Sequence, residues 1–91
     1  KQTRRLEAIR GGRKALKAVR DARMAESRIP TTLAGAAKRD ADTRVQSAQS
    51  KARRMLERAW LDLRDVAVFA TDDDKVSELL HQVETMRASA G

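Results

Sequence analysis

Basic side chains are the group in this sequence whose type and spacing indicate a chemistry, and that chemistry is the recognition of phosphate. The 91 residues include 20 Lys and Arg against 13 Asp and Glu, which gives a net charge of +7. A basic protein attracts polyanions through a long-range, salt-sensitive field. The planar guanidinium group of arginine also matches phosphate geometry. The charge balance therefore predicts an acidic macromolecular partner.

Two sets of basic residues recur at helical spacing. If Ala15 and Ala18 face inward, four basic side chains project from the opposite side of a first helix, over roughly 15 Å at 1.5 Å per residue. In a second helix, basic residues recur every seven positions with one more beside them. The predicted nucleic-acid contacts are Arg10, Arg13, Lys17 and Arg20 in the first set, and Arg44, Lys51, Arg54 and Arg58 in the second. Acids are scarce in both sets, whereas solubilising helix faces normally interleave them. The alternative is that both sets are ordinary solvated helix faces with no ligand.

Other chemistries find little support in the sequence. Cysteine is absent, and His81 has no second histidine with which to share a metal. The run Asp72-Asp73-Asp74 lacks the spaced ligands of a calcium loop and is typical of a helix-capping turn. There is no glycine-rich phosphate loop and no nucleophile motif. We therefore expect a protein without catalytic residues, metal or cofactor, and not an enzyme.

The elements that must position the basic residues are helical, because Ala, Arg, Glu and Leu abound and there is a single proline. A first helix is predicted at about residues 2–28. Small residues recur through it at alternating spacings of three and four, which is the heptad pattern of a coiled coil. The members of this series are Ala8, Gly11, Ala15, Ala18, Ala22, Ala25 and Ile29. The pair Gly11-Gly12 is either a close contact point or a break in the helix.

A second helix is predicted at about residues 32–70, antiparallel to the first. Pro30 disfavours helix in the residue before it, and Thr31 or Thr32 could cap the helix that follows. The small-residue series resumes here at Ala34, Ala37, Ala41, Val45, Ala48, Ala52, Met55 and Ala59. The fold class expected is thus all-α, an antiparallel long helical hairpin with a coiled-coil-like, Ala-rich seam, in one domain over residues 1–91.

A shorter third helix, at about residues 73–88, is predicted to pack on the end of this hairpin. Beyond Met55 the second helix is apolar around most of its circumference, at Leu56, Trp60, Leu61, Leu63, Val66, Ala67, Val68 and Phe69. These side chains need a cover, and the third segment offers one face made of Val76, Leu79, Leu80, Val83 and Met86. The main core is therefore expected between Met55 and Met86.

The stretch Thr32–Val45, followed by Ala48 and by Lys51–Leu56, resembles the helix-turn-helix of sigma factors and response regulators. The resemblance covers less than a third of the chain and implies a second route to DNA binding. Its turn would be Asp40-Ala41-Asp42, which is about two residues shorter than the usual turn and lacks its glycine.

Two functions from different classes follow from these features. The first is a non-enzymatic helical protein that binds nucleic acid, DNA ahead of RNA, through phosphate contacts with little base readout. The alternative is a structural or adaptor subunit of a larger assembly, such as a virion, a motor or a ribonucleoprotein, that docks through its apolar helix faces. A thin seam also predicts a homo-oligomer or an obligate protein partner.

The expected location is the cytoplasm or the nucleoid. No apolar run is long enough to span a bilayer, and the basic faces lack the large apolar partner face of a membrane-surface helix. The sequence begins at Lys1 and not at Met, so it leaves open whether a targeting segment once preceded it.

Overall fold

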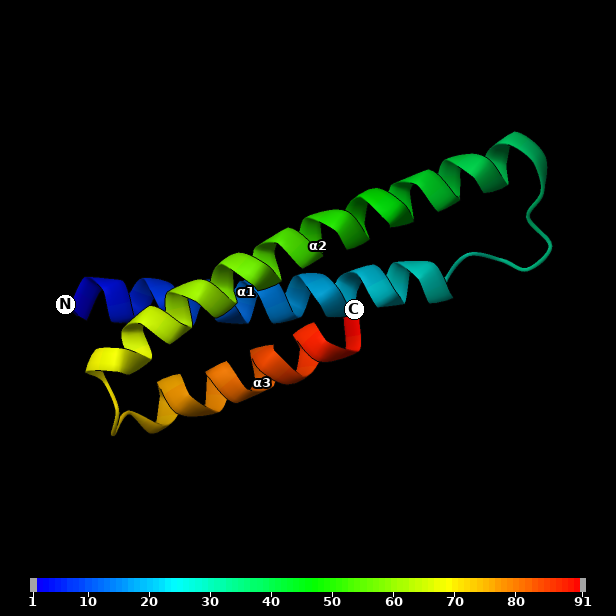
Figure 1. Ribbon diagram of the computed structural model, residues 1–91. Coiled ribbons are helices and arrows are strands. Elements are labelled where there is room, and N and C mark those ends of the chain that lie inside the picture. The colour runs from blue at the N-terminus through cyan, green and yellow to red at the C-terminus, as the bar shows by residue number, and fades with distance from the viewer. Residues whose placement is uncertain (1, 91) are drawn as a thin grey trace.

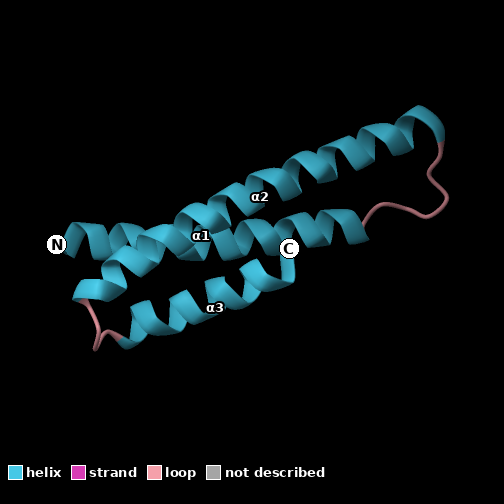
Figure 2. Ribbon diagram, viewed as in Figure 1, coloured by secondary structure: helices cyan, strands magenta, loops and turns pink. Residues whose placement is uncertain are grey.

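The computed structural model describes residues 2–90 as three helices, α1 (Gln2–Ser27), α2 (Gly35–Phe69) and α3 (Asp74–Ala90). α1 and α2 run antiparallel as a long hairpin, and α3 folds back along one end of it (Figure 1). Figure 2 shows that two short loops join these helices. The Cα atoms extend over 52 × 19 × 17 Å, so the molecule is a rod. The predicted fold class is confirmed.

Small residues form the contact between α1 and α2. Ala15 is fully buried, and Ala8, Ala22, Ala52 and Ala59 are nearly so. Side chains of this size allow two helix backbones to approach closely. The predicted seam is therefore confirmed along most of the hairpin. Toward the Pro30 loop it fails, because the two helices diverge (Figure 1) and leave Ala25, Ala34 and Ala37 exposed.

The loop between α1 and α2 is longer than predicted. The backbone N–H of Leu33 donates to the Pro30 carbonyl at 3.1 Å, so residues 30–33 form a turn. Ala34 is then extended, and α2 begins at Gly35 without a side-chain cap. The predicted cap by Thr31 or Thr32 is wrong because both residues belong to the turn, upstream of the first helical residue. Gly35 has a φ of 66°, a left-handed conformation that glycine adopts without steric cost.

α2 continues without interruption from residue 35 to residue 69. Asp40-Ala41-Asp42 therefore lies inside a helix, and the helix-turn-helix turn that the resemblance implied does not form there. The stretch lacks the glycine that the motif has in its turn. Its backbone instead continues the i to i−4 hydrogen bonds of the α-helix.

α3 begins where the acidic run predicted a capping turn. The Asp73 carboxylate accepts hydrogen bonds from the backbone N–H groups of Lys75 (3.1 Å) and Val76 (3.3 Å). These two donors have no partner within the helix, so the cap satisfies them. Val76, Leu79 and Val83 are buried, and Leu80 and Met86 are half-buried against the core. The predicted apolar face of the third helix is confirmed.

The core extends further onto α1 than predicted. Ile9, Leu16 and Val19 join the cluster built around Leu56 and Leu63, because α3 packs against both helices of the hairpin. The predicted cover over the end of α2 is incomplete. Leu61, Val68 and Phe69 stay exposed, since one helix can cover only one side of α2.

The sequence left open whether the Gly11-Gly12 pair makes a close contact or breaks the helix. In the structure, Gly12 makes a close contact. It is buried, and a Cβ atom built there would lie 2.8 Å from Cδ2 of Leu79 and 3.1 Å from Cδ1 of Leu63. Gly11, which the small-residue series assigned to the seam, has open space at the same position, so that assignment is wrong by one residue. α1 runs through both glycines without a break. The absence of a side chain at Gly12 lets α1 approach α2 and α3 together.

Candidate nucleic-acid interface

The α1 set of predicted residues lies exposed on the side of the helix turned away from α2. Arg10, Arg13, Lys17 and Arg20 are all exposed, while Ala15 is fully buried in the seam. Consecutive residues of an α-helix are about 100° apart, so these four share the arc opposite Ala15. The seam fixes this arrangement, since the basic face is what remains once the small residues pack inward.

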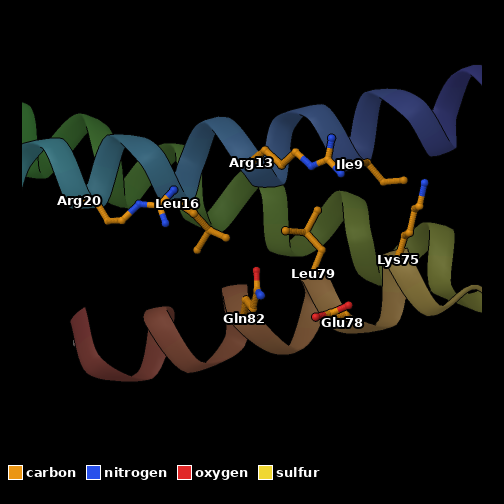
Figure 3. Close-up of a pocket in the computed structure, with 8 residues that line it drawn as sticks. All are labelled: Ile9, Arg13, Leu16, Arg20, Lys75, Glu78, Leu79 and Gln82. Carbon is orange, nitrogen blue, oxygen red and sulfur yellow. The ribbon is translucent and has the colours of Figure 1, made fainter.

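Two residues of this set line a hollow of about 300 Å³ between α1 and α3. Figure 3 shows Arg13 and Arg20 reaching along α1 on one wall, with Lys75 and Gln82 rising from α3 on the other. Glu78 also lines the hollow, together with the apolar side chains of Ile9, Leu16 and Leu79. Sequence reasoning missed Lys75, because nothing in the local pattern says that it lines the same hollow as Arg13 and Arg20.

The α2 set is also exposed. Arg44, Lys51 and Arg58 each directly precede a buried seam residue, and Arg54 lies further from the seam. Seven residues rise by about 10.5 Å, so the three form a line of well-separated positive charges along α2. None of the α2 set lines the α1–α3 hollow. The structure thus brings Arg13 and Arg20 together with Lys75, but it does not bring the two sets onto one surface.

Two of the eight residues have acidic partners on their own helix. Lys17 Nζ lies 2.9 Å from Asp21 Oδ2, and Arg58 Nε lies 3.4 Å from Asp62 Oδ1. Both pairs are exposed, and such pairs are worth about 0–1 kcal/mol. The other six have no acidic partner within ion-pair distance among residues 2–90. Acids are therefore less scarce on these faces than the sequence pattern indicated, but most of the charge is available to a ligand.

Other charged residues hold α3 in place. Arg5 on α1 pairs with Asp73, which raises the pKa of Arg5 and, together with the cap, lowers the pKa of the Asp73 carboxyl. Arg87 on α3 makes two hydrogen bonds to Glu57 on α2, at 2.7 and 3.1 Å. These bonds lower the pKa of Glu57 and raise that of Arg87. Both pairs tie α3 to the hairpin.

The two aromatic residues are poorly placed to stack on bases. The guanidinium carbons of Arg87 and Arg64 lie 3.8 and 4.5 Å from the ring centroid of Trp60, and Trp60 Nε1 donates to Glu84 at 3.3 Å. Phe69 is exposed, but the hollow that it lines holds three aspartates against Arg5 and Lys75, a net negative set that does not favour phosphate. Stacking on aromatic rings, a common mode for single strands, has no platform beside the basic faces.

His81 is exposed on α3, in a shallow hollow with Arg20, Arg23 and Met86. Within the described part of the chain no group of three or more His, Cys, Asp or Glu residues is arranged to hold a metal ion. Asp73, the central residue of the acidic run, is taken up by the α3 cap and by Arg5.

Comparison with models of protein families, with curated proteins and with solved structures finds no match to this chain. Among the three described helices, none contains a stretch long and apolar enough to cross a membrane.

Proposed function

We propose that this protein binds nucleic acid without catalysis, by contacts between its basic helix faces and the phosphate backbone. The observation that carries the proposal is the α1 face, where Arg10, Arg13 and Arg20 are exposed and have no acidic partner among residues 2–90. Lys75 adds a fourth charge across the hollow.

The length of this face suits a run of phosphates. Arg10 and Arg20 are separated by roughly 15 Å along the helix axis, which corresponds to the rise of about four base pairs along the axis of a DNA duplex at 3.4 Å each. Long arginine side chains on a regular surface hold phosphate without reading base edges. We therefore expect weak dependence on sequence and a strong dependence on salt.

The test is replacement of Arg10, Arg13, Lys17 and Arg20 together by Gln, followed by a salt titration of binding to random duplex DNA. Gln keeps good helix propensity, and all four side chains are exposed, so the fold should be retained. Each lost phosphate contact should flatten the slope of log affinity against log salt by about 0.7–0.9. Binding to duplex DNA, single-stranded DNA and RNA should all weaken.

A matched control removes four other exposed charges, by replacing Arg4, Arg28, Arg39 and Arg53 with Gln. It has the same net charge as the test variant, so it separates a local interface from a general attraction. The control should bind more tightly than the test variant at every salt concentration. If the test variant keeps the parent's affinity and slope, the α1 face is only a solvated surface.

A second candidate function, a subunit that docks on a protein neighbour, is favoured by the exposed apolar side chains at the end of α2. Val68 and Phe69 are 72% and 71% exposed, and Leu61 is 41% exposed. Sedimentation of the purified chain tests it. An oligomer that dissociates when Val68 and Phe69 are replaced by Ser would support this function, and a stable monomer that binds DNA would count against it.

A further inference from the structure

The α2 set of basic residues lies on the side of the rod turned away from α3. Arg58 directly precedes the buried seam residue Ala59, and Trp60 directly follows it. The two side chains therefore point about 100° to either side of the seam. Trp60 contacts α3 through Glu84 and Arg87, so Arg58 faces the opposite way.

The same reasoning places the other members of the α2 set. Arg44 precedes the buried Val45, and Lys51 precedes the buried Ala52. Arg44, Lys51 and Arg58 therefore share what we call the open side, which α3 does not cover. On α1, Lys14 precedes Ala15 and lies on this side as well.

The α1 set reaches the other side of the rod. Leu16 follows Ala15 and lines the hollow against α3, and Arg13 and Arg20 line the same hollow together with Lys75. Figure 3 shows these three basic side chains on its two walls. Glu78 lines this hollow as well, so its charged side chains sum to a net positive charge. Arg13, Arg20 and Lys75 therefore make it a second basic surface, the groove side, across the body of the molecule from the open side.

We propose that one molecule bridges two segments of nucleic acid, one on the groove side and one on the open side. This inference rests on the proposed phosphate binding and adds to it a second, separate binding surface. A single straight duplex cannot contact both sides, because the packed helices lie between them.

The thickness of the rod permits both segments to bind at once. Its Cα atoms extend 17 to 19 Å across the long axis, and side chains add to that width. The Debye length at physiological ionic strength is about 8 Å, so repulsion between two duplexes held this far apart is largely screened. The exposed pair of Arg58 with Asp62 does not prevent binding, since such pairs open at little cost.

The experiment captures a fluorescent random duplex on beads that carry an unlabelled one, with the protein as the only link. Wild-type protein should capture the fluorescent duplex at intermediate protein concentration and release it in excess, when every duplex binds its own protein molecules. Single-duplex binding is measured in parallel by fluorescence anisotropy.

Three variants, each lacking three positive charges of the parent, locate the two surfaces. One replaces Arg13, Arg20 and Lys75 with Gln, and the second replaces Arg44, Lys51 and Arg58 with Gln. The control replaces Arg4, Arg28 and Arg39, which are exposed near the ends of the rod. Each test variant should still bind a single duplex through the surface that it keeps, with the salt slope of that surface. Both should lose capture, and the control should retain it.

The outcomes separate this inference from the proposed function. If the wild-type protein binds no duplex at low salt, both the proposed function and the bridge are wrong. Binding of single duplexes without capture overturns the bridge alone. Capture that survives in either test variant also overturns it, because one surface would then suffice and a dimer would form the link. Loss of single-duplex binding in both variants, with helix content unchanged, would mean that the two surfaces serve one duplex.

Discussion

The two ends of the rod are built differently. At the α3 end three helices meet, and Leu56, Leu63, Val76 and Val83 are almost completely removed from solvent. At the loop end, residues 24–50, only α1 and α2 are present, and Val45 is the sole buried side chain. The polar side chains of Glu26 and Gln49 join the helices there by a hydrogen bond of 2.7 Å. A third helix, and not the seam, creates most of the core.

The largest difference between the ends should appear when buried side chains are truncated. Leu63→Ala should cost about 2–5 kcal/mol of the free energy of unfolding, since it leaves a cavity among three helices. Val45→Ala removes two methyl groups that are worth about 0.8 kcal/mol each, so it should cost about 1.5 kcal/mol or less. Urea denaturation followed by circular dichroism measures both. Equal losses would contradict the description of the loop end as weakly packed.

The adjacent glycines test the close approach at the α3 end. Gly11→Ala should stabilise the protein by about 0.5–1 kcal/mol, because alanine favours helix and its Cβ meets open space. Gly12→Ala has the same helical gain but must displace Leu79 and Leu63, and such overpacking typically costs about 1–3 kcal/mol.

Thermal denaturation of the two glycine variants should therefore order them, with Gly11→Ala above the parent and Gly12→Ala below Gly11→Ala. If both variants gain equally, α3 can shift without cost, and Gly12 is not required for the packing.

Acid should loosen the α3 end before the loop end. The pKa values of Glu57 and Asp73 are lowered, by the hydrogen bonds from Arg87 and from Arg5 respectively. A carboxyl group whose pKa is lower in the folded state stabilises the fold above its unfolded pKa, and that contribution is lost as pH falls through the folded pKa. We expect the melting temperature to fall as pH drops below the ordinary carboxyl range.

The double variant Glu57→Gln and Asp73→Asn should show a flatter dependence of melting temperature on pH than the parent protein. Asp40→Asn, an exposed carboxylate near the loop end, serves as the control. A parent-like acid profile in the double variant would mean that other carboxylates carry the effect.

The smallest effect is expected at the loop end. Gln49→Ala removes the hydrogen bond to Glu26 in an exposed setting, and surface substitutions of this kind usually change stability by less than about 0.5 kcal/mol. A loss of more than 1.5 kcal/mol in urea denaturation, the upper end for a typical hydrogen bond, would show that the loop end depends on this single contact.

The sequence by itself determined the elements and their apolar faces. Small residues at spacings of three and four predicted the hairpin, Pro30 predicted its loop, and Asp73 lies in the run that predicted the cap of the third helix. These features follow from local backbone preference and helical period, which depend only on neighbouring residues. The positions of the basic residues on their helices were predictable for the same reason.

Only the tertiary structure decided which neighbours those faces meet. The period of a helix does not say how far around it a covering helix reaches, so the exposure of Leu61, Val68 and Phe69 could not be predicted. Nor could the helical period distinguish Gly12, which meets Leu63 and Leu79, from Gly11, which has open space, because that difference depends on where α2 and α3 pack. The pair of Arg5 with Asp73 and the hollow lined by both Lys75 and Arg13 bring together residues far apart in the chain. The side on which α3 packs separates the groove side from the open side, and that choice is made by the packing of all three helices at once.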